Sequence, residues 1–211
     1  MKSPFFRRAT ALACLAACTF AGSVRAGPAA PPTMTDATRV PPAFVVGSIY
    51  PIAVPFTDQA GRTFSLADMR GRTMVVSMFY TSCQFVCPML VDAIRATERK
   101  LSDAERRRLG VLLVSFDPAR DSVDVLRKTA RDRDLDAERW TLARTDSKNV
   151  RKFAAALDIK YRALDDGDFN HSTVLILVDA NGRIVGRTTE LAGADPSFVK
   201  LVKATLASSS P

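Results

Sequence analysis

The sequence contains little of what several common kinds of active site need. Its 211 residues include one histidine and four cysteines. It shows no glycine-rich phosphate loop, no Ser-His-Asp constellation and no internal repeat. These absences argue against a P-loop nucleotide-binding protein, a serine hydrolase and a repeat protein. The chemistry of this chain therefore has to be sought in a few residues.

The net charge is small once the N-terminal segment is set aside. The whole chain carries +8 at pH 7, and residues 1–26 hold four of the basic residues and no acidic one. The remaining charge of +4 is too low to indicate nucleic-acid binding. Basic and acidic residues also alternate, as in Arg131-Asp132-Arg133-Asp134, which is typical of a solvated helix face. We expect no nucleic-acid partner.

Residues 1–26 have the pattern of an export signal. A basic start precedes an apolar run over 9–20, which is too short for a stable membrane anchor. Val24-Arg25-Ala26 then provides a small-residue cleavage site. The pattern predicts export by the general secretory route to the periplasmic side.

A second processing site lies within this signal. Leu15-Ala16-Ala17-Cys18 resembles a bacterial lipobox, in which Cys18 would be lipidated and would anchor the mature protein to the membrane. Alternatively, Cys14 and Cys18 are small apolar members of a cleaved signal, and the mature protein is soluble. Residues 27–43, rich in Pro, Ala and Thr, predict a flexible tether. A single folded domain is expected over 44–208.

Apolar runs of strand length alternate with helical patterns along this domain. Strands are predicted at 74–80, 111–116, 140–143, 174–178 and 183–186, and helices after the cysteines and at 102–109, 122–131, 150–157 and 196–206. Gly61 predicts a hairpin that joins 56–58 to 63–65, and Asn181-Gly182 predicts the turn of the last hairpin. Gly110 predicts the end of the helix that begins after Ser102. These elements predict an α/β fold with a central, mostly parallel sheet, an antiparallel C-terminal hairpin and helices on both faces. Their order is thioredoxin-like.

Cys83 and Cys87 follow the first central strand and stand at the start of the next helical segment. Residues four apart on a helix share one face, so the two sulfurs are expected to form a disulfide or to bind one soft metal ion together. The helix N-terminus is expected to lower both thiol pKa values.

His171 precedes the strand at 174–178, in a segment predicted to be a loop. In a thioredoxin-like fold this loop lies opposite the cysteines, and Ser172 takes the place of the usual cis-proline. A lone histidine is often an ordinary surface residue, but two thiolates with an imidazole form a ligand set that favours copper. A structural zinc site needs four protein ligands, and this chain offers three obvious candidates.

Three blocks together resemble the Sco/SenC family. They are residues 81–88 with both cysteines, Ser115-Phe116-Asp117-Pro118-Ala119-Arg120-Asp121, and His171 before a strand ending in Asp179-Ala180-Asn181-Gly182. The resemblance implies a thioredoxin-like copper protein that helps to assemble the copper A centre of cytochrome c oxidase. It implies Cys83, Cys87 and His171 as ligands of Cu(I) and Cu(II), and Asp117 as a nearby acidic residue. Asp117 can equally be the N-cap of a helix that begins at Pro118.

Three functions compete for the cysteine pair. The leading one is a metallochaperone, not an enzyme with turnover, that delivers copper to the oxidase subunit carrying the copper A site. The alternative is a thiol-disulfide reductase, with Cys83 and Cys87 as its redox-active pair, that keeps the oxidase cysteines reduced. A third, a peroxidase, would need one of Arg62, Arg70 or Arg72 beside a cysteine. Other periplasmic copper or thiol-redox proteins are further expected partners. Three residues between the cysteines and Ser172 in the opposing loop favour the metallochaperone over the reductase.

Overall fold

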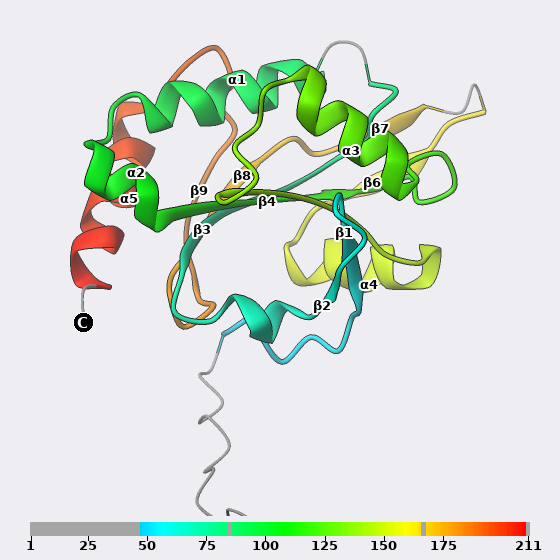
Figure 1. The fold of residues 1–211 in the computed structure, drawn as a ribbon, viewed down its shortest axis with the longest axis horizontal. Coiled ribbons are helices and arrows are strands. Elements are labelled where there is room, and N and C mark those ends of the chain that lie inside the picture. The colour runs from blue at the N-terminus through cyan, green and yellow to red at the C-terminus, as the bar shows by residue number, and fades with distance from the viewer. Residues whose placement is uncertain (1–46, 84–85, 166–167, 210–211) are drawn as a thin grey trace, which may run out of the picture. The chain divides into compact units, whose positions relative to one another are not determined.

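The computed structural model describes residues 47–83, 86–165 and 168–209 (Figure 1). The export signal at 1–26, the lipobox with Cys18 and the tether at 27–43 lie outside the described residues, so these assignments stay predictions. Within the described part of the chain, no helix has the length and apolar character needed to cross a membrane.

A seven-stranded sheet has the order β2-β1-β5-β4-β3-β8-β9. The strands of this sheet are β1 (Phe56–Asp58), β2 (Thr63–Phe64), β3 (Thr73–Phe79), β4 (Leu109–Ser115), β5 (Trp140–Arg144), β8 (Leu175–Val178) and β9 (Ile184–Thr188). Strands β3, β4 and β5 pair in parallel, and all the other pairs are antiparallel. Five of the seven strands consequently run in one direction, with β1 and β8 opposed to them.

The helices cover both faces of the sheet. They are α1 (Val86–Glu98), α2 (Asp103–Arg108), α3 (Val123–Asp132), α4 (Ser147–Ala156) and α5 (Pro196–Ser208), with a short 3-10 helix η1 (Leu66–Met69). Figure 1 shows α1 and α3 over one face and α4 over the other. Every residue of β3 and β4 is buried as a result, which explains why both strands read as continuous apolar runs. The predicted α/β architecture is confirmed.

Two hairpins form where the turn residues predict them. In the first, Phe56 pairs with Phe64. In the last, β8 pairs with β9, and the Asp179 carboxylate accepts the backbone N–H groups of Asn181 and Arg183 at 2.9 and 2.8 Å. Gly182 has φ = 82°, a left-handed conformation that glycine adopts without strain.

Gly110 does not end a helix, contrary to the sequence prediction. Helix α2 ends at Arg108, and Gly110 lies within β4, paired with Met74. A Cβ atom at Gly110 would lie 2.8 Å from Nε of Arg72, so the glycine makes room for this side chain. Close approach of a side chain, and not helix termination, explains the glycine.

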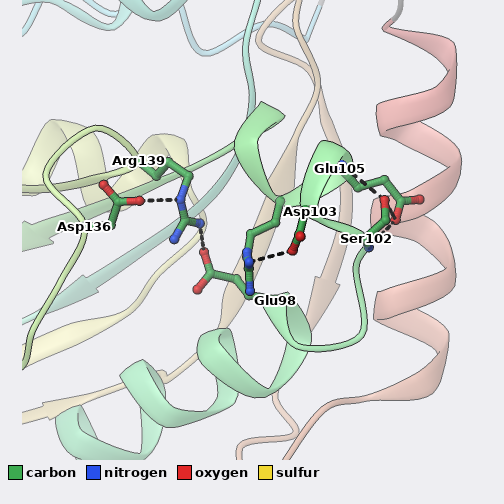
Figure 2. Close-up of polar contacts among 7 residues, drawn as sticks. Glu98, Ser102, Asp103, Glu105, Asp136 and Arg139 are labelled. Carbon is green, nitrogen blue, oxygen red and sulfur yellow. Dashed lines mark hydrogen bonds and ion pairs between the residues drawn. The ribbon is translucent and has the colours of Figure 1, made fainter.

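Separate polar contacts hold the end of α1 that is distant from the cysteines and the start of α2 (Figure 2). The predicted helix start at Ser102 is confirmed, because its hydroxyl and the Glu105 side chain form a reciprocal capping box. Arg139, before β5, forms one ion pair with Glu98 of α1 and another with Asp136, where Nε lies 2.7 Å from Oδ2. The helix that carries Cys87 is thereby tied to the loop before β5.

A second, two-stranded sheet was missed by the sequence analysis. Strands β6 (Tyr161–Ala163) and β7 (Phe169–His171) form an antiparallel hairpin in which Tyr161 pairs with His171. His171 therefore ends a strand and does not lie in a loop, as was predicted. The alternation Ile159, Tyr161, Ala163 was the available signal, but each strand has only three residues, too few to show a clear period.

Candidate functional site

The two cysteines lie where β3 leaves the sheet, at the edge formed by the carboxyl ends of the parallel strands. Cys83 precedes α1 in the turn after Tyr80, and its N–H donates to the Tyr80 carbonyl at 3.3 Å. Cys87 is the second residue of α1, and its N–H donates to Sγ of Cys83 at 3.4 Å. The prediction that both cysteines share a helix face is wrong for Cys83. The turn nevertheless brings the two thiols into contact, and no disulfide joins them.

Cys87 is the buried member of the pair, with 7% of its surface exposed. Burial raises the pKa of its thiol to about 12, and the neighbouring Cys83 thiol adds to the effect. The predicted lowering by the helix N-terminus is therefore wrong for Cys87. Desolvation can shift a pKa by several units, whereas a helix end contributes only about 1 kcal/mol, less than one pKa unit.

This difference between the thiols predicts selective alkylation of Cys83. In the reduced mature protein at pH 8, we expect iodoacetamide to modify Cys83 at least about tenfold faster than Cys87, because Cys87 is buried and its raised pKa leaves little of it as thiolate, whereas Cys83 is partly exposed. Raising the pH above 8 should speed the alkylation of Cys87, because its raised pKa means that its thiolate fraction is still increasing there. Peptide mass spectrometry gives both rates, and the rates should converge in urea. Faster modification of Cys87 in the folded protein would contradict the assignment.

Asp121, whose surface is 1% exposed, holds the cysteine turn in place, and the sequence analysis did not assign it this position. Its carboxylate accepts hydrogen bonds from the hydroxyls of Ser115 and Thr81 and from the Thr81 backbone N–H, the last at 3.2 Å. These bonds fix the turn that carries Cys83 to the end of β4. Asp121 stood in the sequence block from Ser115, but its partner Thr81 is 40 residues away.

Asp117 is not the cap of a helix at Pro118. Pro118 lies in a turn, and α3 begins at Val123 with Ser122 as its N-cap. The cap interpretation is thus wrong. The Asp117 carboxylate forms an ion pair with Arg120 and lines a different cavity from that of the cysteines.

His171 is half-buried against an aromatic cluster. Its ring lies 4.8 Å from that of Phe116 and meets Tyr80 edge-on at 5.9 Å. Burial lowers the pKa of the imidazole, so the ring is neutral at pH 7, the form that binds metals. Nδ1 lies 3.3 Å from the Ser172 carbonyl, which assigns the proton to Nδ1 and leaves Nε2 as the nitrogen able to coordinate.

Tyr80 links the thiols to the histidine. Its side chain forms a hydrogen bond with Cys83, and its ring contacts the ring of His171. Burial and this hydrogen bond raise the pKa of Tyr80 to about 12. Within the part of the chain that the structure describes, no three His, Cys, Asp or Glu side chains gather closely enough to hold a metal. The structure thus brings Cys83 and Cys87 together and leaves His171 one aromatic ring away.

The arginines considered for a peroxidase lie elsewhere. Arg62 pairs with Asp58, Arg70 covers the Tyr50 ring, and Arg72 lines a cavity at the opposite end of β3. None of the three lines the cavity that contains the cysteines. The arginine that does line this cavity is Arg133, so these three arginines give no support to peroxidase chemistry.

Two curated proteins share part of this sequence. The mitochondrial SCO2 protein of Saccharomyces cerevisiae is 26% identical over 134 residues, which cover 61% of this chain and 44% of the yeast protein. The match thus spans less than half the length of that relative. The SCO1 protein homolog of Bacillus subtilis is 24% identical over 136 residues, covering 62% of this chain and 70% of the relative.

Solved structures of Sco proteins share the fold. A SCO1/SenC family lipoprotein from Bacillus anthracis superposes with a TM-score of 0.63 at 24% identity, over 72% of this chain and 91% of that one. Copper-bound yeast Sco1 superposes with a TM-score of 0.63 at 20% identity, over 75% of this chain and 88% of the yeast chain. BsSco, described as a Sco family cytochrome c oxidase assembly protein with a disulfide switch, gives 0.62 at 21% identity, over 72% and 90%. The predicted thioredoxin-like arrangement is confirmed.

The family itself is shown by sequence. The SCO1/SenC family model matches residues 52–206, which include both cysteines, Asp121 and His171. This match spans well over half of the chain and nearly all of the sheet and helices described above. The chain therefore belongs to the SCO1/SenC family.

Proposed function

We propose that this protein binds copper through Cys83, Cys87 and His171 and delivers it to the copper A site of a cytochrome c oxidase subunit. The observation that carries the proposal is the contact between two thiols that no disulfide joins, with a neutral imidazole separated from them by the ring of Tyr80. Membership of the family, the copper bound to yeast Sco1 and the assembly role stated for BsSco support it.

The donor set fits copper in both oxidation states. Thiolates suit Cu(I), and an imidazole adds affinity for Cu(II). Copper displaces the thiol proton of Cys87, which its raised pKa keeps bound at pH 7, so apparent affinity should rise with pH. Transfer would proceed by ligand exchange, with an acceptor thiolate first replacing Cys83, because Cys83 is the more accessible sulfur.

A metal and thiol count on the reduced mature protein tests copper binding. We expect one copper per chain and two thiols protected from alkylation. Copper bound with both thiols still reactive would refute the ligand set. Delivery is tested separately in a deletion strain, where the wild-type chain, but not Cys83→Ser, should restore oxidase copper.

The contact between the thiols also supports the second candidate, a thiol-disulfide reductase acting on the oxidase cysteines. In this reaction Cys83 would attack the target disulfide, Cys87 would resolve the mixed disulfide, and the protein would end with a Cys83–Cys87 disulfide. Oxidation and copper binding should exclude each other. Titrating the oxidised protein with copper tests this, since full affinity without reductant would show that the sulfurs are not ligands.

We further propose that the protein is exported and held at the periplasmic face of a membrane through lipidated Cys18. The lipobox-like sequence and the lipoprotein description of the Bacillus anthracis relative support this. Fractionation of cells expressing the full-length chain, with Cys18→Ala alongside, tests it. Release of the mutant alone identifies Cys18 as the anchor, whereas a soluble wild type identifies cleavage after Ala26.

A further inference from the structure

A cleft of about 410 Å³ opens beside the aromatic cluster against which His171 packs. Its walls come from the turn after β4, from α4 and from the β6–β7 hairpin. Its surface is largely apolar and includes the rings of Phe116, Tyr161 and Phe169, with the exposed Ala119 at its edge. A cleft of this character can receive an apolar side chain of another protein.

The aromatic floor of the cleft is continuous with the proposed copper ligands. Phe116 contacts both Tyr161, at 5.0 Å between ring centres, and His171, at 4.8 Å. The ring centres of Phe169 and Tyr80 lie 5.2 Å apart, and Tyr80 in turn forms a hydrogen bond with Cys83. A partner seated in the cleft would therefore stand against Phe116, which contacts the imidazole, while Phe169 and Tyr80 separate it from the partly exposed sulfur of Cys83. Ligand exchange then requires the acceptor's own cysteines to reach past this aromatic cluster to the sulfur.

The charge around the cleft is positive. Arg151 and Arg162 are exposed and line it, and Arg144 donates from Nη2 to the Pro118 carbonyl at 2.7 Å. Among the described residues none of these three arginines forms an ion pair, and the buried Nε of Arg144 has no hydrogen-bond partner. Asp117 also lines the cleft and forms an ion pair with Arg120, and the charges of Asp121 and Asp168 act on Arg120 as well.

We propose that this cleft is the docking site for the copper acceptor. The acceptor inserts an apolar side chain between Phe116, Tyr161 and Phe169, and carboxylates beside that side chain pair with Arg151 and Arg162. The proposal rests on the proposed function, because it names the surface by which the same site reaches its target. It requires the acceptor's copper-binding cysteines to lie close to an apolar residue flanked by acidic ones.

Two variants test the cleft against a purified, reduced copper A domain of a cytochrome c oxidase subunit. Ala119→Trp fills the cleft from an exposed position, and Arg162→Glu reverses a rim charge. We expect each to weaken binding of the copper A domain by at least about tenfold in titration calorimetry, and to slow copper transfer similarly. The loss caused by Arg162→Glu should shrink at high salt. Cu(I) affinity should stay within about twofold of the wild type.

Matched controls lie on α5, away from the cleft lining. Ala204→Trp adds the same bulk at an exposed position, and Lys200→Glu makes the same change of charge. Neither variant should alter binding of the copper A domain. Wild-type binding in both cleft variants would overturn the docking site while leaving the copper function intact. Absence of binding by the wild type would also overturn it. Cleft-dependent binding without copper transfer would instead uphold the docking site and refute delivery.

Discussion

Replacing Cys83 or Cys87 with serine should abolish copper binding. Loss of a group that only supports a metal ligand costs about 10- to 100-fold in affinity, so removal of a thiolate ligand itself should cost well over about 100-fold. In the wild type, Cu(II) should give an intense sulfur-to-copper charge-transfer band, because thiolate is a direct ligand. Optical titration with Cu(II) and competition titration with Cu(I) measure both effects.

The control for this experiment is Met89→Ala. Met89 is 46% exposed and follows Cys87 on α1, and its thioether is a soft donor that could compete for Cu(I). We expect Cu(I) affinity within about twofold of the wild type. An unchanged charge-transfer band in either cysteine variant would remove that cysteine from the site, and a large loss in Met89→Ala would add the thioether to it.

Replacing His171 with alanine should separate the two oxidation states. Two thiolates hold Cu(I) in near-linear coordination, whereas Cu(II) needs more ligands and prefers nitrogen donors. We therefore expect Cu(II) affinity to fall by more than about 100-fold and Cu(I) affinity by less than about tenfold. The same pair of titrations measures the difference.

Added imidazole and thermal unfolding distinguish ligation from packing in this variant. The His171 ring packs against Phe116 and Tyr80, so its loss leaves a space that free imidazole can enter. Recovery of the charge-transfer band with imidazole is expected. Equal loss of both oxidation states, together with a lowered unfolding temperature and no recovery, would show that His171 is structural.

The result for His171 also bears on how the site closes. In the described structure the imidazole contacts Tyr80, and the two thiols and the imidazole do not gather closely enough to hold a metal, so joining the three ligands requires the β6–β7 hairpin or the turn at Cys83 to shift. A Cu(II) site that depends on His171 would show that this shift occurs. The nitrogen that coordinates should be Nε2, because Nδ1 faces the Ser172 carbonyl.

Local sequence determined most of the fold. The apolar runs of β3 and β4 specify buried central strands, and Ser102 and Ser122 cap the helices that follow them. Asn181-Gly182 specifies the last turn. Each of these signals is complete within about ten residues, because hydrophobic period, capping and turn conformation depend on near neighbours. The adjacency of the two thiols also follows from their short spacing.

Tertiary structure alone decided the chemistry of the site. The pKa of Cys87 is set by burial beneath packed elements, which outweighs the helix end that the sequence reveals. Asp121 acquires its role from Thr81, 40 residues away, and His171 at the end of β7 acquires its position from Phe116, the residue after β4. The short β6–β7 hairpin that presents His171 is stabilised by its aromatic contacts and not by its own sequence pattern. Desolvation and long-range contacts arise only when distant segments pack, so no local pattern encodes them.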